Sequence, residues 1–209
     1  MSAVRRLAAG ASASAALAYP FGVWFALGRF DARTVGLGML ALLALRMLLL
    51  SPERARTWGR ALSGPALALG AIALAAALTN APLLLLAVPA LASVALLLAF
   101  ARSLRHGPPL VERLARATNP DLTPAEIAYC RSVTLVWCGF FAANAAAILA
   151  LARLAPYAWW LAWTGFGSYL AIGSLLATEY VVRRARFGRF EAHALDRALA
   201  HLLGARASG

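Results

Sequence analysis

Charge is scarce in this sequence, and lysine is missing from it altogether. Only 13% of the 209 residues are charged and 62% are hydrophobic, whereas a soluble domain has about 25% charged and about 45–50% apolar residues. All twenty basic residues are arginine. One soluble core cannot bury this much apolar surface in a chain of this length. The composition therefore argues against an ordinary soluble domain and predicts an integral membrane protein.

Motifs for catalysis or metal binding are also missing. The sequence has no G-x-S-x-G turn, no phosphate-binding loop and no cluster of Cys or His. Cys130 and Cys138 would lie about 12 Å apart along a helix, which is too far for a disulfide. His193 and His201 share a predicted helical face with Arg197, but two histidines eight residues apart do not close a metal site. We therefore predict no catalytic residue, no metal and no cofactor.

The net charge of +12 comes from arginines that stand at the ends of apolar runs. A nucleic-acid-binding protein needs a solvated basic face instead, so we predict no nucleic-acid partner. If the N-terminus is cytoplasmic, sixteen arginines fall in cytoplasmic segments and three in outer loops. By the positive-inside rule, both termini are then expected in the cytoplasm.

Six apolar segments approach the ~20 residues that a helix needs to cross a bilayer. Lipid offers no partner to an unpaired backbone group, so each segment must be helical. We predict an all-α membrane bundle over residues 1–182, followed by a basic amphipathic cytoplasmic tail at 183–209. The predicted spans are 8–27, 34–50, 61–79, 83–100, 132–154 and 159–182.

The first segment admits a second interpretation. Its basic start, alanine-rich run and A-x-A-like sites are typical of a signal peptide that is cleaved. The apolar run continues through Trp24 and Phe25, beyond the length of a typical signal core. This extra length favours a retained helix.

A polar cytoplasmic loop is predicted at 101–131. Pro108 and Pro109 can open a short helix, and the residues that follow are typical of a helix lying on the membrane surface. Its apolar face would hold Leu110, Val111, Leu114 and Ala115, and its polar side Glu112, Arg113 and Arg116.

A second helix start is predicted at the end of this loop. Thr123 and Glu126 have the spacing of a capping box, and Pro124 suits the first helical position. The helix is expected to continue without a break into the fifth span. A surface helix, a turn and a capped helix start therefore account for most of the polar loop.

Few polar side chains interrupt the apolar segments. Asn144 in the fifth span needs a hydrogen-bond partner, most simply on a neighbouring helix. Glu179 precedes Arg183 by one turn, the favourable order for an ion pair, although an acid inside a membrane segment is also a functional candidate. His106, at the exit of the fourth span, is read as structural rather than catalytic.

Two stretches carry a family resemblance, GPPLVERLARATNPDLTPAEIAYCRSVTLVWCGFFAANA and EYVVRRARF. The region from about Gly107 to Phe187 resembles bacterial inner-membrane proteins commonly encoded among aryl-polyene and xanthomonadin-type pigment genes, beside fatty-acid-synthase-like enzymes. The preceding segments match in hydropathy alone. The resemblance implies a role in making, transferring or exporting a polyene–lipid product and brings no established catalytic residues. The family-like side chains are Arg113, Arg116, Pro120, Tyr129, Arg131, Thr134, Trp137, Glu179, Tyr180 and Arg183.

We therefore expect an accessory protein of the bacterial inner membrane. Its predicted partners are the lipid bilayer and an acidic acyl-carrier protein or soluble synthesis enzymes, since opposite charges speed encounter. The positive-inside rule alone would also explain the basic cytoplasmic side. A transporter or flippase of the lipid product, and a membrane acyl- or glycosyl-type transferase, are the alternatives. The candidate residues for binding a partner or the membrane surface are Arg113, Arg116, Tyr129, Arg131, Glu179, Tyr180 and Arg183.

Overall fold

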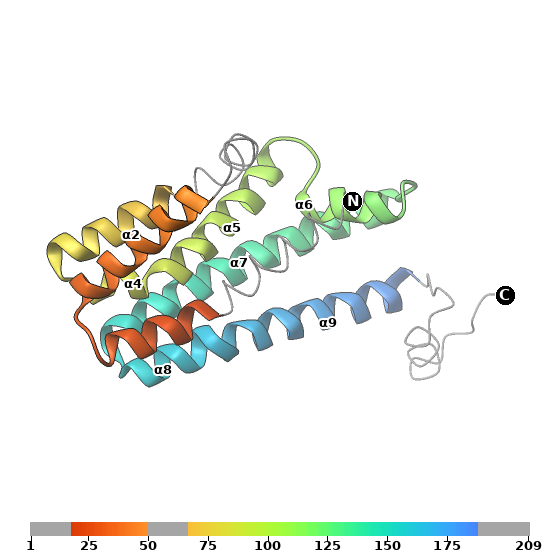
Figure 1. Ribbon diagram of the computed structural model, residues 1–209. Coiled ribbons are helices and arrows are strands. Elements are labelled where there is room, and N and C mark those ends of the chain that lie inside the picture. The colour runs from red at the N-terminus through yellow and green to blue at the C-terminus, as the bar shows by residue number, and fades with distance from the viewer. Residues whose placement is uncertain (1–17, 50–66, 188–209) are drawn as a thin grey trace. The chain divides into compact units, whose positions relative to one another are not determined.

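The computed structural model describes residues 18–49 and 67–187, and within these ranges it contains helices and no strand (Figure 1). The all-α prediction is confirmed for this part of the chain. The start of the predicted first span and the predicted tail beyond Phe187 lie outside the described residues. The helices are Ala18–Leu27, α2 (Ala32–Leu49), Leu67–Thr79, α4 (Pro82–Leu86), α5 (Val88–Arg105), α6 (Leu110–Thr118), α7 (Pro124–Leu154), α8 (Tyr157–Ala162), the π-helical η1 (Trp163–Gly167) and α9 (Ser168–Phe187).

Among the described helices, α5 and α7 are long and apolar enough to cross a membrane. Only 17% of the most apolar stretch of α5 is buried, and 28% of that of α7. A helix that is apolar on all sides belongs either in a protein core or in lipid, and these two helices are not core helices by burial. They favour membrane association. Shorter apolar helices occupy three further predicted segments, at Ala18–Leu27, Ala32–Leu45 and Leu67–Thr79.

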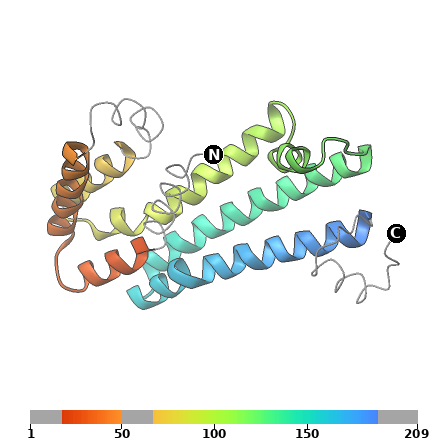
Figure 2. The ribbon, with the colours of Figure 1, turned by 45° about the vertical axis from the view of Figure 1, so that its right-hand side comes forward.

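The described residues divide into two compact units. Unit 1 holds the described part of Met1–Ala95 together with Ala142–Phe166. Unit 2 holds Leu96–Phe141 and the described part of Gly167–Gly209. The divisions fall inside α5, α7 and η1, and Figure 2 shows α7 as one continuous helix. Each unit has its own hydrophobic cluster.

The predicted fourth span, 83–100, is interrupted. α4 ends at Leu86 and α5 begins at Val88, with Ala87 as a turn residue between them. Pro89 lies in the first turn of α5, where its fixed φ is tolerated. Because proline has no N–H, it cannot donate a hydrogen bond back to α4 and continue that helix into α5. The fourth apolar segment is therefore a short helix followed by a longer one.

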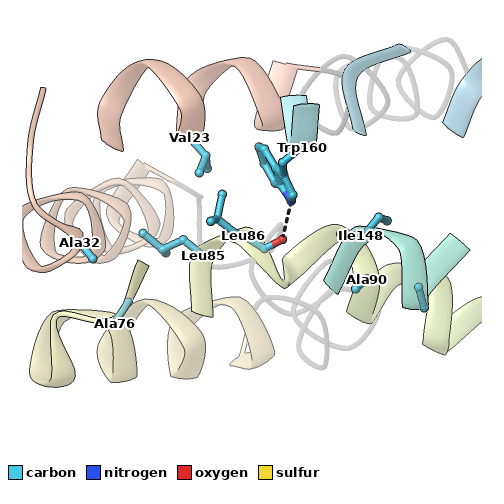
Figure 3. Close-up of a cluster of buried hydrophobic side chains, with 9 residues drawn as sticks. Val23, Ala32, Ala76, Leu85, Leu86, Ala90, Ile148 and Trp160 are labelled. Carbon is cyan, nitrogen blue, oxygen red and sulfur yellow. Dashed lines mark hydrogen bonds between the residues drawn. The ribbon is translucent and has the colours of Figure 1, made fainter. Parts of the chain in front are cut away.

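Aromatic donors from other helices satisfy the carbonyl groups at this break. The carbonyl oxygen of Leu85, which would have bonded to an N–H at Pro89, accepts a hydrogen bond of 2.8 Å from the hydroxyl of Tyr19. The indole N–H of Trp160 donates to the carbonyl oxygen of Leu86 at 3.1 Å (Figure 3). These contacts stabilise the break, because an unpaired carbonyl in an apolar interior is costly.

The hydrophobic cluster of unit 1 surrounds the same break. Trp160 is fully buried, and the side chains of Leu85, Leu86 and Ile148 are almost fully buried. Figure 3 shows Trp160, Leu86 and Val23 converging from different helices. The cluster consists of Val23, Ala32, Ala76, Leu85, Leu86, Ala90, Ala145, Ile148 and Trp160.

Close backbone packing joins α2 to the Leu67–Thr79 helix. A Cβ atom at Gly36 would lie within 3.0 Å of main-chain atoms of that helix, so only glycine fits there. The main-chain N–H of Arg33 donates to Asn80 Oδ1 at 2.9 Å, and its Nε donates to the carbonyl oxygen of Ala77 at 3.2 Å. Small residues at a helix interface are typical of membrane helices, which associate by close packing.

The capping box predicted at the start of α7 is confirmed. Glu126 Oε2 accepts hydrogen bonds from the main-chain N–H and the hydroxyl of Thr123, at 2.8 and 2.9 Å. The N–H of Glu126 donates in return to Thr123 Oγ1 at 3.3 Å. From Pro124 the helix runs unbroken to Leu154 and so includes the predicted fifth span.

A helix is present where one was predicted after Pro109, as α6, and the burial of its side chains within unit 2 follows the predicted faces only in part. Val111 and Ala115 are buried as expected, whereas Glu112 is buried too and Leu114 is 62% exposed. Glu112 is tolerated there because Arg116 NH2 lies 2.8 Å from its Oε1. The hydrophobic cluster of unit 2 consists of Val111, Ala115, Cys130, Val133, Trp137 and Phe141.

Candidate functional site

A half-open cavity of about 630 Å³ lies within unit 2. Residues of α5, α6, α7 and α9 line it. Both ribbon views show α9 running alongside α7 in this unit. The volume falls within the ~300–1,000 Å³ that is typical of sites for small molecules.

One wall of the cavity is aromatic. Phe100 from α5 and Trp137 and Phe141 from α7 line it, and the last two are buried. The ring centroids of Phe100 and Phe141 lie 5.3 Å apart, and those of Trp137 and Phe141 lie 5.5 Å apart. These distances are typical of packed aromatic pairs. Leu96, Val133 and Leu176 add apolar side chains to the lining.

The polar and charged part of the cavity lining comes from the last turns of α9. Glu179, Tyr180, Arg183 and Arg184 all line the cavity, since residues three and four positions apart are neighbours on the surface of a helix. Arg183 Nε donates to Glu179 Oε1 at 2.7 Å, and Arg183 NH2 lies 2.6 Å from the same oxygen. The guanidinium of Arg184 lies 5.1 Å from the centroid of the Tyr180 ring. The predicted Glu179–Arg183 ion pair is thereby confirmed.

Tyr129 joins α7 to α9 beside this polar wall. Its hydroxyl donates to the main-chain carbonyl of Glu179 at 3.5 Å. Its ring meets that of Phe187 edge to face, with centroids 5.4 Å apart. The guanidinium of Arg186 lies 5.8 Å from the Tyr129 ring centroid. Tyr129 therefore holds the last turns of α9 against α7.

The structure brings together some of the predicted site residues and not others. Glu179, Tyr180 and Arg183 line the cavity, and Tyr129 packs next to them. The other three candidates, Arg113, Arg116 and Arg131, do not line it.

Two of these three arginines make structural contacts. Arg116 pairs with Glu112 and donates from NH1 to the carbonyl oxygen of Pro120 at 3.2 Å. Arg131 NH1 donates to the carbonyl oxygen of Leu104, in the last turn of α5, at 3.4 Å. Arg113 is exposed on α6.

Sequence reasoning missed most of the aromatic wall. Phe100 and Phe141 were not singled out, Trp137 was noted only through the family resemblance, and Arg184 was passed over. The four-residue spacing of Trp137 and Phe141 places both on one face of a helix. That signal was available, but nothing in the sequence indicated that Phe100 would meet them.

Asn144, another polar residue noted in the sequence, has hydrogen-bond partners within the fold. Asn144 Nδ2 donates to Ser93 Oγ at 3.0 Å, and Asn144 Oδ1 accepts from the indole N–H of Trp163 at 3.0 Å. The expected partners of Asn144 on neighbouring helices are thus present. His106 is exposed in the turn that follows α5. Within residues 18–49 and 67–187, no group of three or more His, Cys, Asp or Glu could hold a metal ion, and Cys130 and Cys138 are free thiols.

Comparisons with models of known protein families, with curated proteins and with solved structures found no match. The resemblance based on residues 107–187 accordingly stays a prediction. The function has to be argued from the cavity and from the charges of unit 2.

Proposed function

We propose that this chain is a multi-pass accessory protein of the bacterial inner membrane that docks an acidic acyl-carrier protein through unit 2. The observation that carries the proposal is the surplus of arginine: the described residues of unit 2 contain eight arginines and four carboxylates. Most of these arginines are exposed. The exposed ones are Arg102, Arg105, Arg113, Arg116, Arg131 and Arg186.

Three of the four carboxylates already have partners within unit 2. Glu112 pairs with Arg116, Glu179 pairs with Arg183, and Glu126 accepts hydrogen bonds from Thr123 at the start of α7. Their negative charge is therefore offset close to its source. The field that an approaching protein meets is dominated by arginine.

This field supports docking because acyl-carrier proteins are usually acidic. Complementary charge raises the rate of encounter and favours one class of partner. Exposed charges are screened over about 8–10 Å at physiological ionic strength, so such binding must weaken as salt rises. The positive-inside rule accounts for the same arginines without any partner, and salt-sensitive binding separates the two explanations.

The test uses the full-length chain, immobilised in detergent, with an acidic acyl-carrier protein in solution. We expect retention at low salt and its loss at several times physiological ionic strength. Replacing Arg113 and Arg131 by Gln should weaken retention, whereas the matched control Arg29→Gln with Arg153→Gln, outside unit 2, should not. Docking would be contradicted if the carrier protein were not retained, or if its retention did not change with salt. It would also be contradicted if the control variant lost as much retention as the Arg113 and Arg131 variant.

The proposal includes six spans with both termini in the cytoplasm. The apolar helices α5 and α7, the tight turn at Asn80 and the arginine distribution support this topology. In a chain with Cys130 and Cys138 replaced by Ala, Thr79→Cys should react with a membrane-impermeant maleimide in intact spheroplasts. Arg113→Cys should react only after lysis. The reverse pattern, or labelling of both sites in intact spheroplasts, contradicts the topology.

The lipid product whose synthesis or delivery this protein would support is proposed from the resemblance over residues 107–187. It implies a polyene or fatty-acyl lipid, which an acyl-carrier protein would deliver to the cytoplasmic side of the membrane. The arginines of unit 2 would meet the carrier at that side.

Transport or flipping of such a lipid is a second candidate, favoured by the break between α4 and α5. Interrupted helices often mark binding sites in transporters. Here, however, the carbonyl groups of Leu85 and Leu86 already accept hydrogen bonds from Tyr19 and Trp160. Proteoliposomes that flip a labelled fatty-acyl lipid faster than protein-free vesicles would favour transport, and equal rates would remove it.

A further inference from the structure

We propose that the cavity of unit 2 binds a single-chain lipid with an uncharged hydroxyl headgroup. The chain lies against the aromatic wall of Phe100, Trp137 and Phe141, and the hydroxyl lies at the polar lining from α9. This is a small-molecule site in addition to the docking surface proposed above.

The charges on the cavity lining are balanced. Among the described residues that line the cavity, Glu126 and Glu179 are carboxylates, and Arg183 and Arg184 are cations. The lining therefore has no formal surplus of either sign. An ion that leaves water for such a place loses its hydration without gaining a compensating charge, which is costly. The balance favours an uncharged ligand.

The charged groups of α9 also have contacts along their own helix. Arg183 NH2 lies 2.6 Å from Glu179 Oε1, and Arg183 Nε donates to the same oxygen at 2.7 Å. The guanidinium of Arg184 lies 5.1 Å from the centroid of the Tyr180 ring. An ionised headgroup would have to compete with these contacts, whereas an uncharged headgroup leaves them in place.

A hydroxyl suits this polar lining because it both donates and accepts hydrogen bonds. A guanidinium offers only donors and an ionised carboxylate only acceptors, and the lining from α9 presents both kinds of group. A carboxylate ligand could only accept, and an ammonium ligand could only donate. The hydroxyl is the small headgroup that can use both.

The chemistry of the aromatic wall selects the chain. Trp137 and Phe141 are buried, and Val133 on the same lining is apolar. Apart from the indole N–H of Trp137, these side chains have no hydrogen-bonding group. Burying apolar surface contributes about 25 cal/mol per Å², so the wall favours a long hydrocarbon over a small polar molecule.

The volume selects a single chain. At roughly 30 Å³ for each group the size of a water molecule, a cavity of about 630 Å³ holds on the order of twenty such groups. One chain of about sixteen carbons with a hydroxyl has roughly that many heavy atoms, and a phospholipid with two chains has more than about twice as many. The two-chain lipid does not fit inside.

The test is native mass spectrometry on the full-length chain in detergent micelles, with hexadecanol, palmitate and hexadecylamine as probes. The three probes have chains of equal length and differ in the charge of the headgroup. The titration is run at about pH 8, where a carboxylate and a primary amine are both ionised. We expect one hexadecanol per chain and about tenfold weaker retention of each ionised probe, because of the cost of burying an ion.

Two variants test whether charge balance sets this order. Glu179→Gln leaves the lining with one more cation than carboxylates, so palmitate should bind about as well as hexadecanol and hexadecylamine should stay weak. Arg183→Gln leaves one more carboxylate than cations, so hexadecylamine should gain and palmitate should stay weak. If either variant moved both ionised probes in the same direction, charge balance would not be the cause.

A further pair of variants tests the place of the chain. Leu176 is on the lining and 52% exposed, so Leu176→Trp spares the hydrophobic cluster while its larger ring takes up space in the cavity. Retention of hexadecanol should fall severalfold. Leu170→Trp is the matched control, because Leu170 is on the same helix, 71% exposed and not on the lining. It should leave retention unchanged.

Several outcomes would overturn the site. Equal retention of hexadecanol by the Leu176 and Leu170 variants would mean that the chain does not lie in this cavity. A wild type that retained an ionised probe as well as hexadecanol, or better, would remove the uncharged headgroup. A two-chain phospholipid that hexadecanol cannot displace would remove the single chain. Because the titration contains no carrier protein, its failure would leave the docking proposal standing, and the reverse also holds.

Discussion

The indole N–H of Trp160 donates a hydrogen bond of 3.1 Å to the main-chain carbonyl of Leu86, and both side chains are almost completely buried. The two residues are 74 positions apart in the sequence. The bond falls where α4 ends, at a point that the sequence predicted to be the interior of one continuous span. A break in an apolar helix persists only when neighbouring groups satisfy the freed carbonyls.

Removing this donor should destabilise unit 1. We expect Trp160→Phe to lower the free energy of unfolding by about 1–3 kcal/mol for the unsatisfied carbonyl, with a further loss from the smaller ring. Trp159→Phe is the matched control, because Trp159 is 66% exposed. Thermal unfolding in detergent, followed by circular dichroism, should show a lower midpoint for the first variant alone. Equal midpoints would mean that the bond adds nothing.

A pH dependence is expected at the start of α2. Asp31 is its N-cap and accepts a hydrogen bond of 3.1 Å from the N–H of Thr34. The pKa of Asp31 is lowered, first by hydrogen bonding to the Thr34 side chain, then by the Thr34 N–H, with a smaller effect from Arg33. Because the pKa is lower in the folded state, the ionised carboxylate stabilises the fold above the ordinary aspartate pKa of about 3.9. That contribution is lost as the pH falls through the lowered pKa.

The measurement compares the wild type with Asp31→Asn, which keeps a capping oxygen but does not titrate. The difference between their thermal midpoints should be constant from neutral pH down to about pH 5 and should shrink below that. A difference that stays constant to pH 3, or grows, would contradict this assignment.

Local features were the ones that the sequence predicted well. Thr123 and Glu126 are three residues apart, and Glu179 and Arg183 are four apart, so each pair meets as soon as a helix forms. The start of α7 and the ion pair on α9 follow from these spacings. Neither depends on how the helices pack.

Features that depend on packing were not predictable in the same way. Pro89 was a visible sign of an interrupted helix, but the break also needs Tyr19, 66 residues from the carbonyl it bonds. The burial of Glu112 depends on which face of α6 packs against the rest of unit 2. The amphipathic pattern alone does not decide this for an acid that can pair with an arginine one turn away. The cavity is likewise built from α5, α6, α7 and α9, so its lining emerges only when they pack together.

The polar contact between Ser93 and Asn144 should contribute modestly to stability. Ser93→Ala removes the oxygen that accepts from Asn144 Nδ2. Hydrogen bonds between membrane helices average about 0.6 kcal/mol and reach about 1.7 kcal/mol, so we expect a loss in that range. Ser132→Ala is the control, because its exposed hydroxyl donates to the carbonyl of Ala128 in its own helix. Unfolding midpoints in detergent should fall for Ser93→Ala and not for Ser132→Ala.

The contact at Gly36 gives the sharpest test of the packing in unit 1. A Cβ atom there would lie 2.6 Å from the carbonyl oxygen of Ala73 and 2.9 Å from the N–H nitrogen of Ala77. Both atoms belong to helix backbone, so the helices themselves must separate. Overpacking of this kind typically costs about 1–3 kcal/mol, and Gly36→Ala should lower the unfolding midpoint accordingly.

Gly38 in the same helix supplies the control. A Cβ atom at Gly38 would meet nothing within 4 Å, and alanine is a better helix former than glycine by about 1 kcal/mol. Gly38→Ala should therefore leave the midpoint unchanged or raise it, while Gly36→Ala lowers it despite the same gain in helix propensity. If both substitutions stabilised the protein, α2 and the Leu67–Thr79 helix could not approach as closely as the structure places them.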